Sequence, residues 1–160
     1  MEQAQRDLDK AFTCKRKGEL KEYVGNKLTR SRDYTGLGMV KFTQLVLVRK
    51  LEEEYTAPDG DASKTPVVTG QVLVKGDGDG MVQESMAKMY QSATATSMYM
   101  MQSSHPDTFN AVRGLARHMT APREAHVRAL MTLIRYRIST RARGLVLIPK
   151  EIWSPEHKFK

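Results

Sequence analysis

A glycine- and proline-rich stretch from residue 56 to residue 80 divides the chain into two unequal parts. Seven of its positions are glycine or proline, and only the short apolar run VLV at 72–74 interrupts them. Such composition continues neither helix nor strand, because glycine adds backbone freedom and proline lacks an N–H donor. We therefore predict a flexible linker here. The expected organisation is an N-terminal unit at 1–56, the linker at 57–83, a C-terminal unit at 84–148 and a polar tail at 149–160.

The N-terminal unit has two strand-like patterns separated by turn residues. Residues 19–30 and 39–44 mix apolar and polar positions, and the stretch RDYTGLG lies between them. This arrangement predicts an antiparallel hairpin with a long loop. Residues 44–55 place apolar side chains on one face of a helix, and residues 1–17 read as a short amphipathic helix.

The C-terminal unit reads as helical almost throughout. Helices are predicted at 84–103, 107–119 and 121–139, and prolines stand where the last two begin. The run GLVLIP after them reads as a strand. The predicted fold class is therefore α+β: a small antiparallel β-hairpin plus helix, a flexible linker, then a three-helix bundle with a short terminal strand.

Composition excludes several classes of protein. No run approaches the roughly 18 apolar residues of a membrane span, and the first residues lack the apolar core of a secretion signal. Cys14 is the only cysteine, so no internal disulfide can form. We expect an intracellular protein, cytoplasmic or nuclear, with no membrane span.

No complete catalytic, cofactor or metal motif is present. The sequence lacks GxSxG, HExxH, a CxxC pair, a Walker loop and any Asp-Asp dipeptide. The segment KGDGDG at 75–80 lacks the further ligands of a calcium loop and reads as an acidic turn. His105, His118 and His126 are not spaced as two ligands on one helix face, and the nearby methionines (Met86, Met89, Met98, Met100 and Met101) read as core filler. We predict no catalytic residue, no cofactor and no metal.

The charge pattern of the C-terminal unit gives the strongest functional signal. Eight arginines and no lysine lie between His105 and Gly144, against only two acids, Asp107 and Glu124. Arginine presents a planar fork of donors that suits phosphate or carboxylate. A basic helical face is the electrostatic footprint expected for nucleic acid, although a solvated helix surface is the simpler alternative.

One sequence pattern covers nearly the whole chain. GELKEYVGNKLTR at 18–30 resembles the stretch that follows the catalytic hairpin in reverse transcriptases of copia-type LTR retrotransposons. KFTQ and the helix at 41–55 are similar to the next family segment, and 90–147 is similar to the region that leads towards RNase H. The matching positions of this last region are Tyr90, Ser92, Pro106, Asp107, Ala111, Val112, Leu115, Arg117, Met119, Pro122, His126, Arg135, Tyr136, Thr140, Gly144 and Leu145.

The chain also departs from the family pattern. Gln91, Ala95, His105 and Thr108 replace family residues, Val127 stands where the family has tryptophan, and Arg137 occupies an apolar position. The last two changes are each expected to weaken packing by about 1–3 kcal/mol. They indicate a diverged copy or one re-used for another contact.

The resemblance implies a function without catalysis. In the family this region forms the end of the palm, the thumb and the connection, and the thumb packs along the template–primer backbone. It implies a non-catalytic fragment of a Pol polyprotein that binds RNA or an RNA–DNA duplex, without the polymerase carboxylates or the RNase H site. The alternative is a structural subunit that docks into a larger protein or ribonucleoprotein assembly. The predicted contact residues are Arg113, Arg117, Arg128, Arg135, Arg141 and Arg143; Arg137 is expected to lie in the core.

Overall fold

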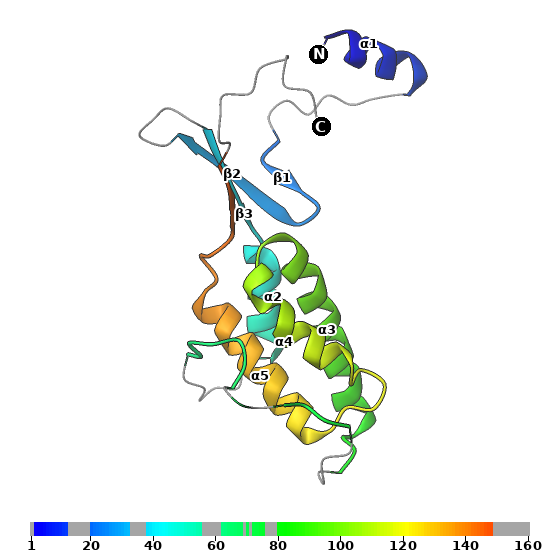
Figure 1. The fold of residues 1–160 in the computed structure, drawn as a ribbon. Coiled ribbons are helices and arrows are strands. Elements are labelled where there is room, and N and C mark those ends of the chain that lie inside the picture. The colour runs from blue at the N-terminus through cyan, green and yellow to red at the C-terminus, as the bar shows by residue number, and fades with distance from the viewer. Residues whose placement is uncertain are drawn as a thin grey trace.

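The computed structural model describes residues 2–12, 20–32, 38–55, 62–68, 70, 72–75 and 80–148 (Figure 1). It is a mixed α+β fold, as predicted. Cys14 and the polar tail from residue 149 lie outside the described residues. The elements in chain order are α1 (Glu2–Ala11), β1 (Glu22–Tyr23), β2 (Asn26–Arg32), β3 (Gly38–Thr43), α2 (Leu45–Tyr55), α3 (Glu84–Ser103), the 3-10 turn η1 (Pro106–Thr108), α4 (Phe109–Ala116), α5 (Glu124–Ser139) and β4 (Leu145–Leu147).

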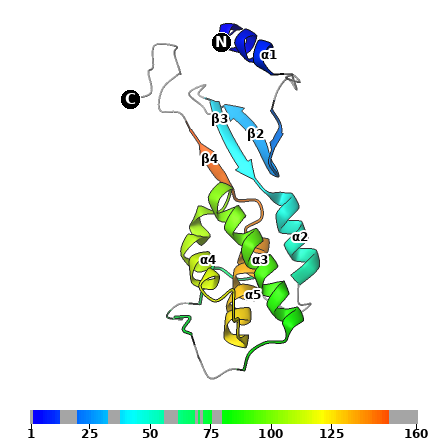
Figure 2. The same ribbon diagram turned by 90° about the vertical axis from the view of Figure 1, so that its right-hand side faces the viewer.

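The strands form one antiparallel sheet in the order β1-β2-β3-β4 (Figure 2). The predicted hairpin is the β2–β3 pair, in which Leu28 lies opposite Phe42. The predicted terminal strand is β4, and it pairs with β3 so that Leu145 also lies opposite Phe42. The last strand in the described residues therefore returns to the sheet that the N-terminal residues build, beyond one end of the helices.

The prediction of one continuous strand over residues 19–30 was wrong. The chain turns at Val24 and Gly25, and β1 pairs back on β2 with Tyr23 opposite Asn26. Both turn residues have positive φ, +46° and +72°, as a two-residue type I′ hairpin turn requires. The Val24 carbonyl accepts hydrogen bonds from the Asn26 side chain at 3.4 Å and from the Tyr99 hydroxyl of α3. A tertiary contact thus supports a turn that the Val-Gly sequence alone did not signal.

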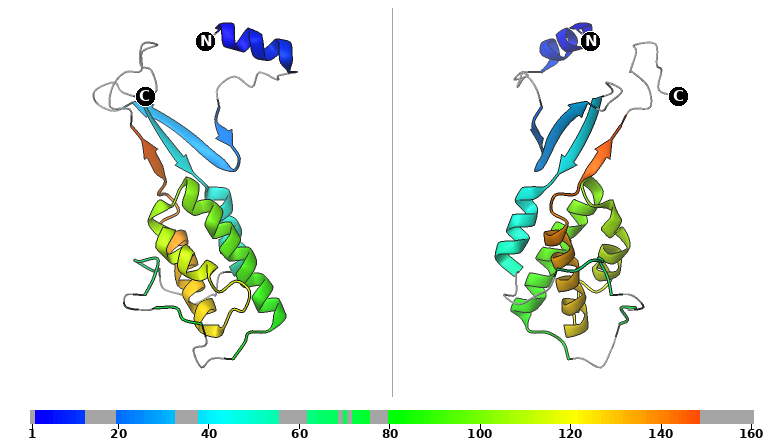
Figure 3. Two further views of the ribbon diagram at one scale, coloured as in Figure 1. Left: turned by 45° about the vertical axis from the view of Figure 1, so that its right-hand side comes forward. Right: turned by 90° about the vertical axis from the view of Figure 1, so that its left-hand side faces the viewer.

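The hydrophobic core lies among the helices (Figure 3). Helix α2 packs against α5 and α3, so within the described residues the bundle has four helices where three were predicted. Of the methionines predicted as core filler, Met100 is fully buried and Met89 and Met101 pack against the core, whereas Met86 and Met98 are more than a third exposed. The buried apolar residues are Val48, Leu51, Tyr90, Ala93, Met100, Ala111, Val112, Leu115, Leu130, Leu133 and Ile134.

The helix boundaries match the sequence expectations unevenly. Helix α3 spans the predicted residues, but the helix predicted at 107–119 is shorter. Pro106 opens the 3-10 turn η1, and α4 ends at Ala116. The amides of His118 and Met119 then bond to carbonyls three residues back, which tightens the chain into turns. In the described residues no helix is long and apolar enough to cross a membrane.

The described residues of the predicted linker lie against the bundle. The Ser139 hydroxyl at the end of α5 donates to the Ser63 carbonyl at 3.0 Å. At the start of α5, His126 Nε2 lies 3.3 Å from the Val74 carbonyl. Between these two points Leu73 packs against the core. The described residues 62–68, 70 and 72–75, called the 62–75 segment below, therefore run alongside α5. The proposed division of the chain into units stays a prediction.

Candidate nucleic-acid interface

The first pair of predicted contact residues lies on α4 and at the residue that caps its C-terminal end. Arg113 and Arg117 are one helical turn apart and both are exposed, whereas Ala111, Val112 and Leu115 on the other side of the helix are buried. Residues four positions apart share a helix face and lie about 6 Å apart. Neither arginine has a hydrogen-bond or ion-pair partner within the part of the chain that the structure describes. The pair thus presents two adjacent cations to solvent.

Helix α5 carries the second pair. Arg128 and Arg135 are seven residues apart, which places them on the same outer face, opposite the buried residues Leu130 and Ile134. Arg128 is exposed and its Nη1 lies 3.5 Å from Glu124 Oε2, one turn earlier. Arg135 is only half-exposed.

The turn after α5 carries the third pair. Arg141 Nη1 lies 3.7 Å from Glu52 Oε2 of α2. Arg143 Nη1 donates to the Tyr136 hydroxyl at 3.0 Å, and its guanidinium carbon lies 5.9 Å from the Tyr136 ring centroid. Lys41 of β3 joins this region, because its Nζ donates to the Ala142 carbonyl at 2.7 Å. The β3–β4 pairing brings Lys41 here, and no local sequence pattern signals that pairing.

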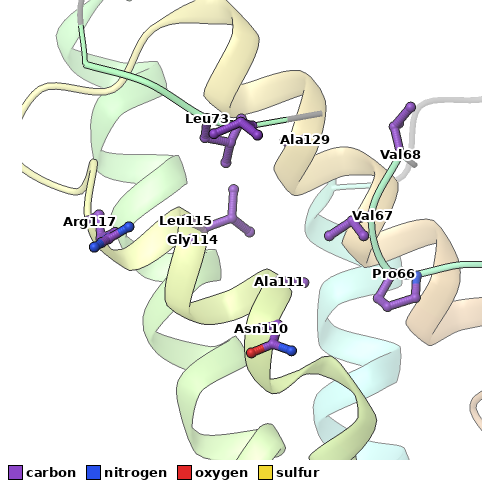
Figure 4. Close-up of a pocket in the computed structure, with 11 residues that line it drawn as sticks. Pro66, Val67, Val68, Leu73, Asn110, Ala111, Gly114, Leu115, Arg117 and Ala129 are labelled. Atoms are coloured by element: carbon purple, nitrogen blue, oxygen red, sulfur yellow. The ribbon is translucent and has the colours of Figure 1, made fainter. Parts of the chain in front are cut away.

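The 62–75 segment lies over the groove between α4 and α5 (Figure 4). Together they enclose a cavity of about 220 Å³, lined by Val67 and Leu73 from the segment and by Gly114 and Ala129 from the helices. Arg117 lies at its edge, and the remaining walls are largely apolar. The six predicted arginines therefore form three pairs. The apolar 62–75 segment covers the groove between α4 and α5, and so lies between the first pair and the second.

Arg137 is fully buried, as the family pattern implied. Its Nη2 donates to the Ser97 carbonyl at 3.0 Å and to Thr108 Oγ1 at 2.9 Å, and its Nη1 lies 3.2 Å from Met100 Sδ. Burial lowers the pKa of Arg137 to about 10, against a smaller opposing effect of the Asp107 carboxylate. At neutral pH the core of the described chain thus holds a cation whose direct acceptors are uncharged.

Asp107 and His105 lie beside this buried cation. The Tyr136 hydroxyl donates to Asp107 Oδ2, and Asp107 Oδ1 lies 3.7 Å from Nδ1 of the buried His105. Burial lowers the pKa of His105, and the positive charge of Arg137 lowers it further, while Asp107 opposes both. These contacts join η1 to α5, so Asp107 does more than begin a helical turn.

The buried His105 side chain should make the free energy of unfolding decrease as the pH falls below neutral. Its pKa is lowered in the folded chain from the ordinary 6.5, so the unfolded chain binds its proton first as the pH falls. The stability that neutral His105 supports is present above pH 6.5 and is lost as the pH falls through the folded pKa, by at most about 1.4 kcal/mol per pH unit. We expect His105→Gln to reduce this loss, measured by urea unfolding at stepped pH. Equal acid slopes for the variant and the parent would contradict the assignment.

The other two histidines stack on one another. The rings of His118 and His126 have centroids 3.9 Å apart and an interplanar angle of 17°. His126 Nδ1 accepts from the Arg123 amide, which leaves Nε2 to donate to the Val74 carbonyl. This histidine therefore holds the start of α5 and the 62–75 segment together. Within the described ranges no group of three or more His, Cys, Asp or Glu residues is placed to hold a metal ion.

Comparison with known proteins gives one informative similarity. No protein-family model matches the chain, and no solved structure matches it. Over 133 residues it is 29% identical to the retrovirus-related Pol polyprotein from transposon TNT 1-94 of Nicotiana tabacum. The match covers 81% of this chain. It covers only about 10% of the length of that polyprotein. The similarity supports a transposon-derived origin of the chain, from a retrotransposon Pol polyprotein.

Proposed function

We propose that the chain is a non-catalytic part of a retrotransposon reverse transcriptase that holds RNA or an RNA–DNA duplex by its phosphates. The observation that carries this proposal is the exposed pair of Arg113, on α4, and Arg117, directly after α4, which has no partner in the described part of the chain. Arginines that already pair within the chain must exchange a partner to reach a phosphate, so the unpaired ones bind at lower cost. The similarity to a Pol polyprotein supplies the reason to choose nucleic acid over another anion.

The six arginines are not expected to contribute equally. Arg113 and Arg117 come first, and Arg135, which is half-exposed, comes next. Arg128, Arg141 and Arg143 contribute less, because Glu124, Glu52 and Tyr136 already hold them. Contacts of this kind fix the position of a duplex and read no sequence. The absence of an Asp-Asp dipeptide from the sequence is the reason to propose binding without polymerisation.

We expect the double variant Arg113→Gln/Arg117→Gln to weaken the salt dependence of duplex binding. Each phosphate contact contributes about −0.9 to the slope of log K against log salt, so the two lost contacts reduce it by about 1.8. Raising salt about fourfold, from roughly 50 to 200 mM, should then weaken the variant about tenfold less than the parent. Fluorescence anisotropy with an end-labelled RNA–DNA duplex measures both slopes.

A charge-matched control separates a defined interface from general attraction. Lys50→Gln/Lys88→Gln removes the same charge from α2 and α3, where both lysines form exposed ion pairs with glutamates one turn away. It should leave the slope close to that of the parent. Equal losses in the two double variants would contradict an interface on α4. No duplex binding by the parent chain, even at low salt, would contradict the proposal as a whole and favour docking into a larger assembly.

A further inference from the structure

The cavity beneath the 62–75 segment is large enough for a small molecule. Its volume is about 220 Å³, and an apolar cavity of about 150 Å³ already holds a benzene ring. Small residues form the walls on the helices, Ala111 and Gly114 on α4 and Ala129 on α5, and the segment covers the space with Val67 and Leu73 (Figure 4). The cavity therefore has room for one ring with a short substituent.

Gly114 keeps part of this space open. Glycine destabilises a helix interior relative to alanine, and Gly114 lies inside α4. Packing does not require a glycine here, because a Cβ would have Leu73 Cδ1 as its nearest neighbour, at an ordinary 3.9 Å. A residue that lowers stability without a packing reason is a sign of a functional site.

The polar residues of the cavity wall favour an anion. Among the described lining residues Asn110 and Arg117 are polar, and none of the lining residues is acidic. Arg117 lies at the edge of the cavity and has no hydrogen-bond or ion-pair partner within the described residues. A guanidinium binds a carboxylate through two parallel N–H donors. An apolar, ring-sized space beside one unpaired guanidinium matches a ligand with an apolar body and a single carboxylate.

We propose that this cavity binds a small apolar carboxylate, with its apolar body between Leu73 and Gly114 and its carboxylate on Arg117. The 62–75 segment is held near both ends of α5, through the carbonyls of Ser63 and Val74. The ligand thus lies beneath a segment that is fixed on both sides, which limits it to the size of a small molecule. This site goes beyond the proposed duplex binding, which uses Arg113 and Arg117 together.

Phenylacetate is the probe, because it has one ring, a short linker and one carboxylate. Its titration into the chain, followed by the methyl NMR signals of Leu73 and Ala129, should show saturable binding with a Kd on the order of 1 mM. Phenylacetamide has nearly the same shape and no charge, so it should bind about threefold to fivefold more weakly. Acetate lacks the ring and should produce no saturable shift.

Two exposed arginines provide the matched variants. Arg117→Gln should weaken phenylacetate binding about threefold to fivefold and leave phenylacetamide binding unchanged. Arg113→Gln removes the same charge one helical turn away, outside the cavity lining. It should change the affinity for phenylacetate less than about 1.5-fold, because salt screens a charge that does not touch the ligand. Gly114→Leu fills the cavity and should abolish saturable binding, with its helix content checked by circular dichroism.

The outcomes separate this site from general attraction to a basic surface. Equal affinities for phenylacetate and phenylacetamide would overturn the proposal, and so would equal losses in Arg117→Gln and Arg113→Gln. The absence of saturable binding of phenylacetate to the parent chain would also overturn it. Both arginines are exposed, so their variants remain informative even if Gly114→Leu does not fold. These titrations contain no nucleic acid, and their result is therefore independent of the proposed duplex binding.

Discussion

An Arg137→Met variant is expected to be more stable than the parent chain, by about 1–3 kcal/mol in the free energy of unfolding. Arg137 is fully buried and its hydrogen-bond acceptors are uncharged, so the core bears the desolvation of a cation without a direct ion pair. Its Nε is buried without a hydrogen-bond partner in the described structure. Methionine has a similar length and no charge. Thr108 Oγ1 keeps the His105 carbonyl as its acceptor, 2.8 Å away.

Arg137→Ala is expected to have the opposite effect, with a loss of about 3–5 kcal/mol. Alanine also removes the charge, but it leaves a cavity among α3, η1 and α5, where Met100 and Thr108 contact the present side chain. Urea unfolding followed by circular dichroism gives both values. The opposite signs make the pair informative, because a loss of stability in Arg137→Met close to that in Arg137→Ala would show that the guanidinium hydrogen bonds outweigh the desolvation.

The same comparison bears on how Arg137 relates to the exposed arginines. It is the arginine that the sequence resemblance assigned to the core, and it ties α5 to α3 and η1. Asp107, which lies close to it, accepts from Tyr136, and Tyr136 in turn holds Arg143. A substitution at Arg137 can therefore shift the position of the Arg143 side chain through Asp107 and Tyr136. Effects of Arg137 variants on nucleic-acid binding are not evidence of direct contact.

The sequence predicts the helices better than it predicts how they meet. Helix α3 begins and ends at the predicted residues, since a long periodic run is a local signal. The packing of α2 on α5 and the pairing of β4 with β3 are contacts between distant segments, which no local pattern specifies. The turn at Val24 was missed for a related reason. A valine with positive φ is unfavourable by itself, and Tyr99 and Asn26 hold its carbonyl.

The candidate interface shows the same limit. Helical spacing alone places Arg113 and Arg117 on one face. Because Ala111, Val112 and Leu115 on the other side are buried, this face points to solvent. The partner of Arg141 is Glu52, a residue of another helix far away in the sequence. The 62–75 segment was predicted as a linker from its composition, yet its carbonyls at Ser63 and Val74 are held at opposite ends of α5. The number of arginines in the sequence therefore overstates how many are available to bind a phosphate without giving up a partner within the chain.

Gly144→Ala is expected to lower the free energy of unfolding by about 2–3 kcal/mol and to detach β4 from β3. A Cβ at this position would lie 2.1 Å from the Phe42 carbonyl oxygen and 2.9 Å from Thr43 Cγ2. The closest atom is backbone, so no side-chain rotation relieves the clash, and the strands must move apart. Gly144 is also one of the residues that match the family pattern. Hydrogen exchange of the amides at 145–147, together with urea unfolding, measures the expected change.

Gly114→Ala provides the matched control for this substitution. A Cβ at Gly114 would have Leu73 Cδ1 as its nearest neighbour, at an ordinary contact distance of 3.9 Å, and the residue lies inside α4. Alanine favours a helix interior over glycine, so this variant should gain about 0.5–1 kcal/mol and leave β4 protected. The same added methyl group thus tests the close backbone approach at Gly144 and the helix propensity at Gly114. Unchanged protection of β4 in Gly144→Ala would contradict the close packing of residue 144 against β3.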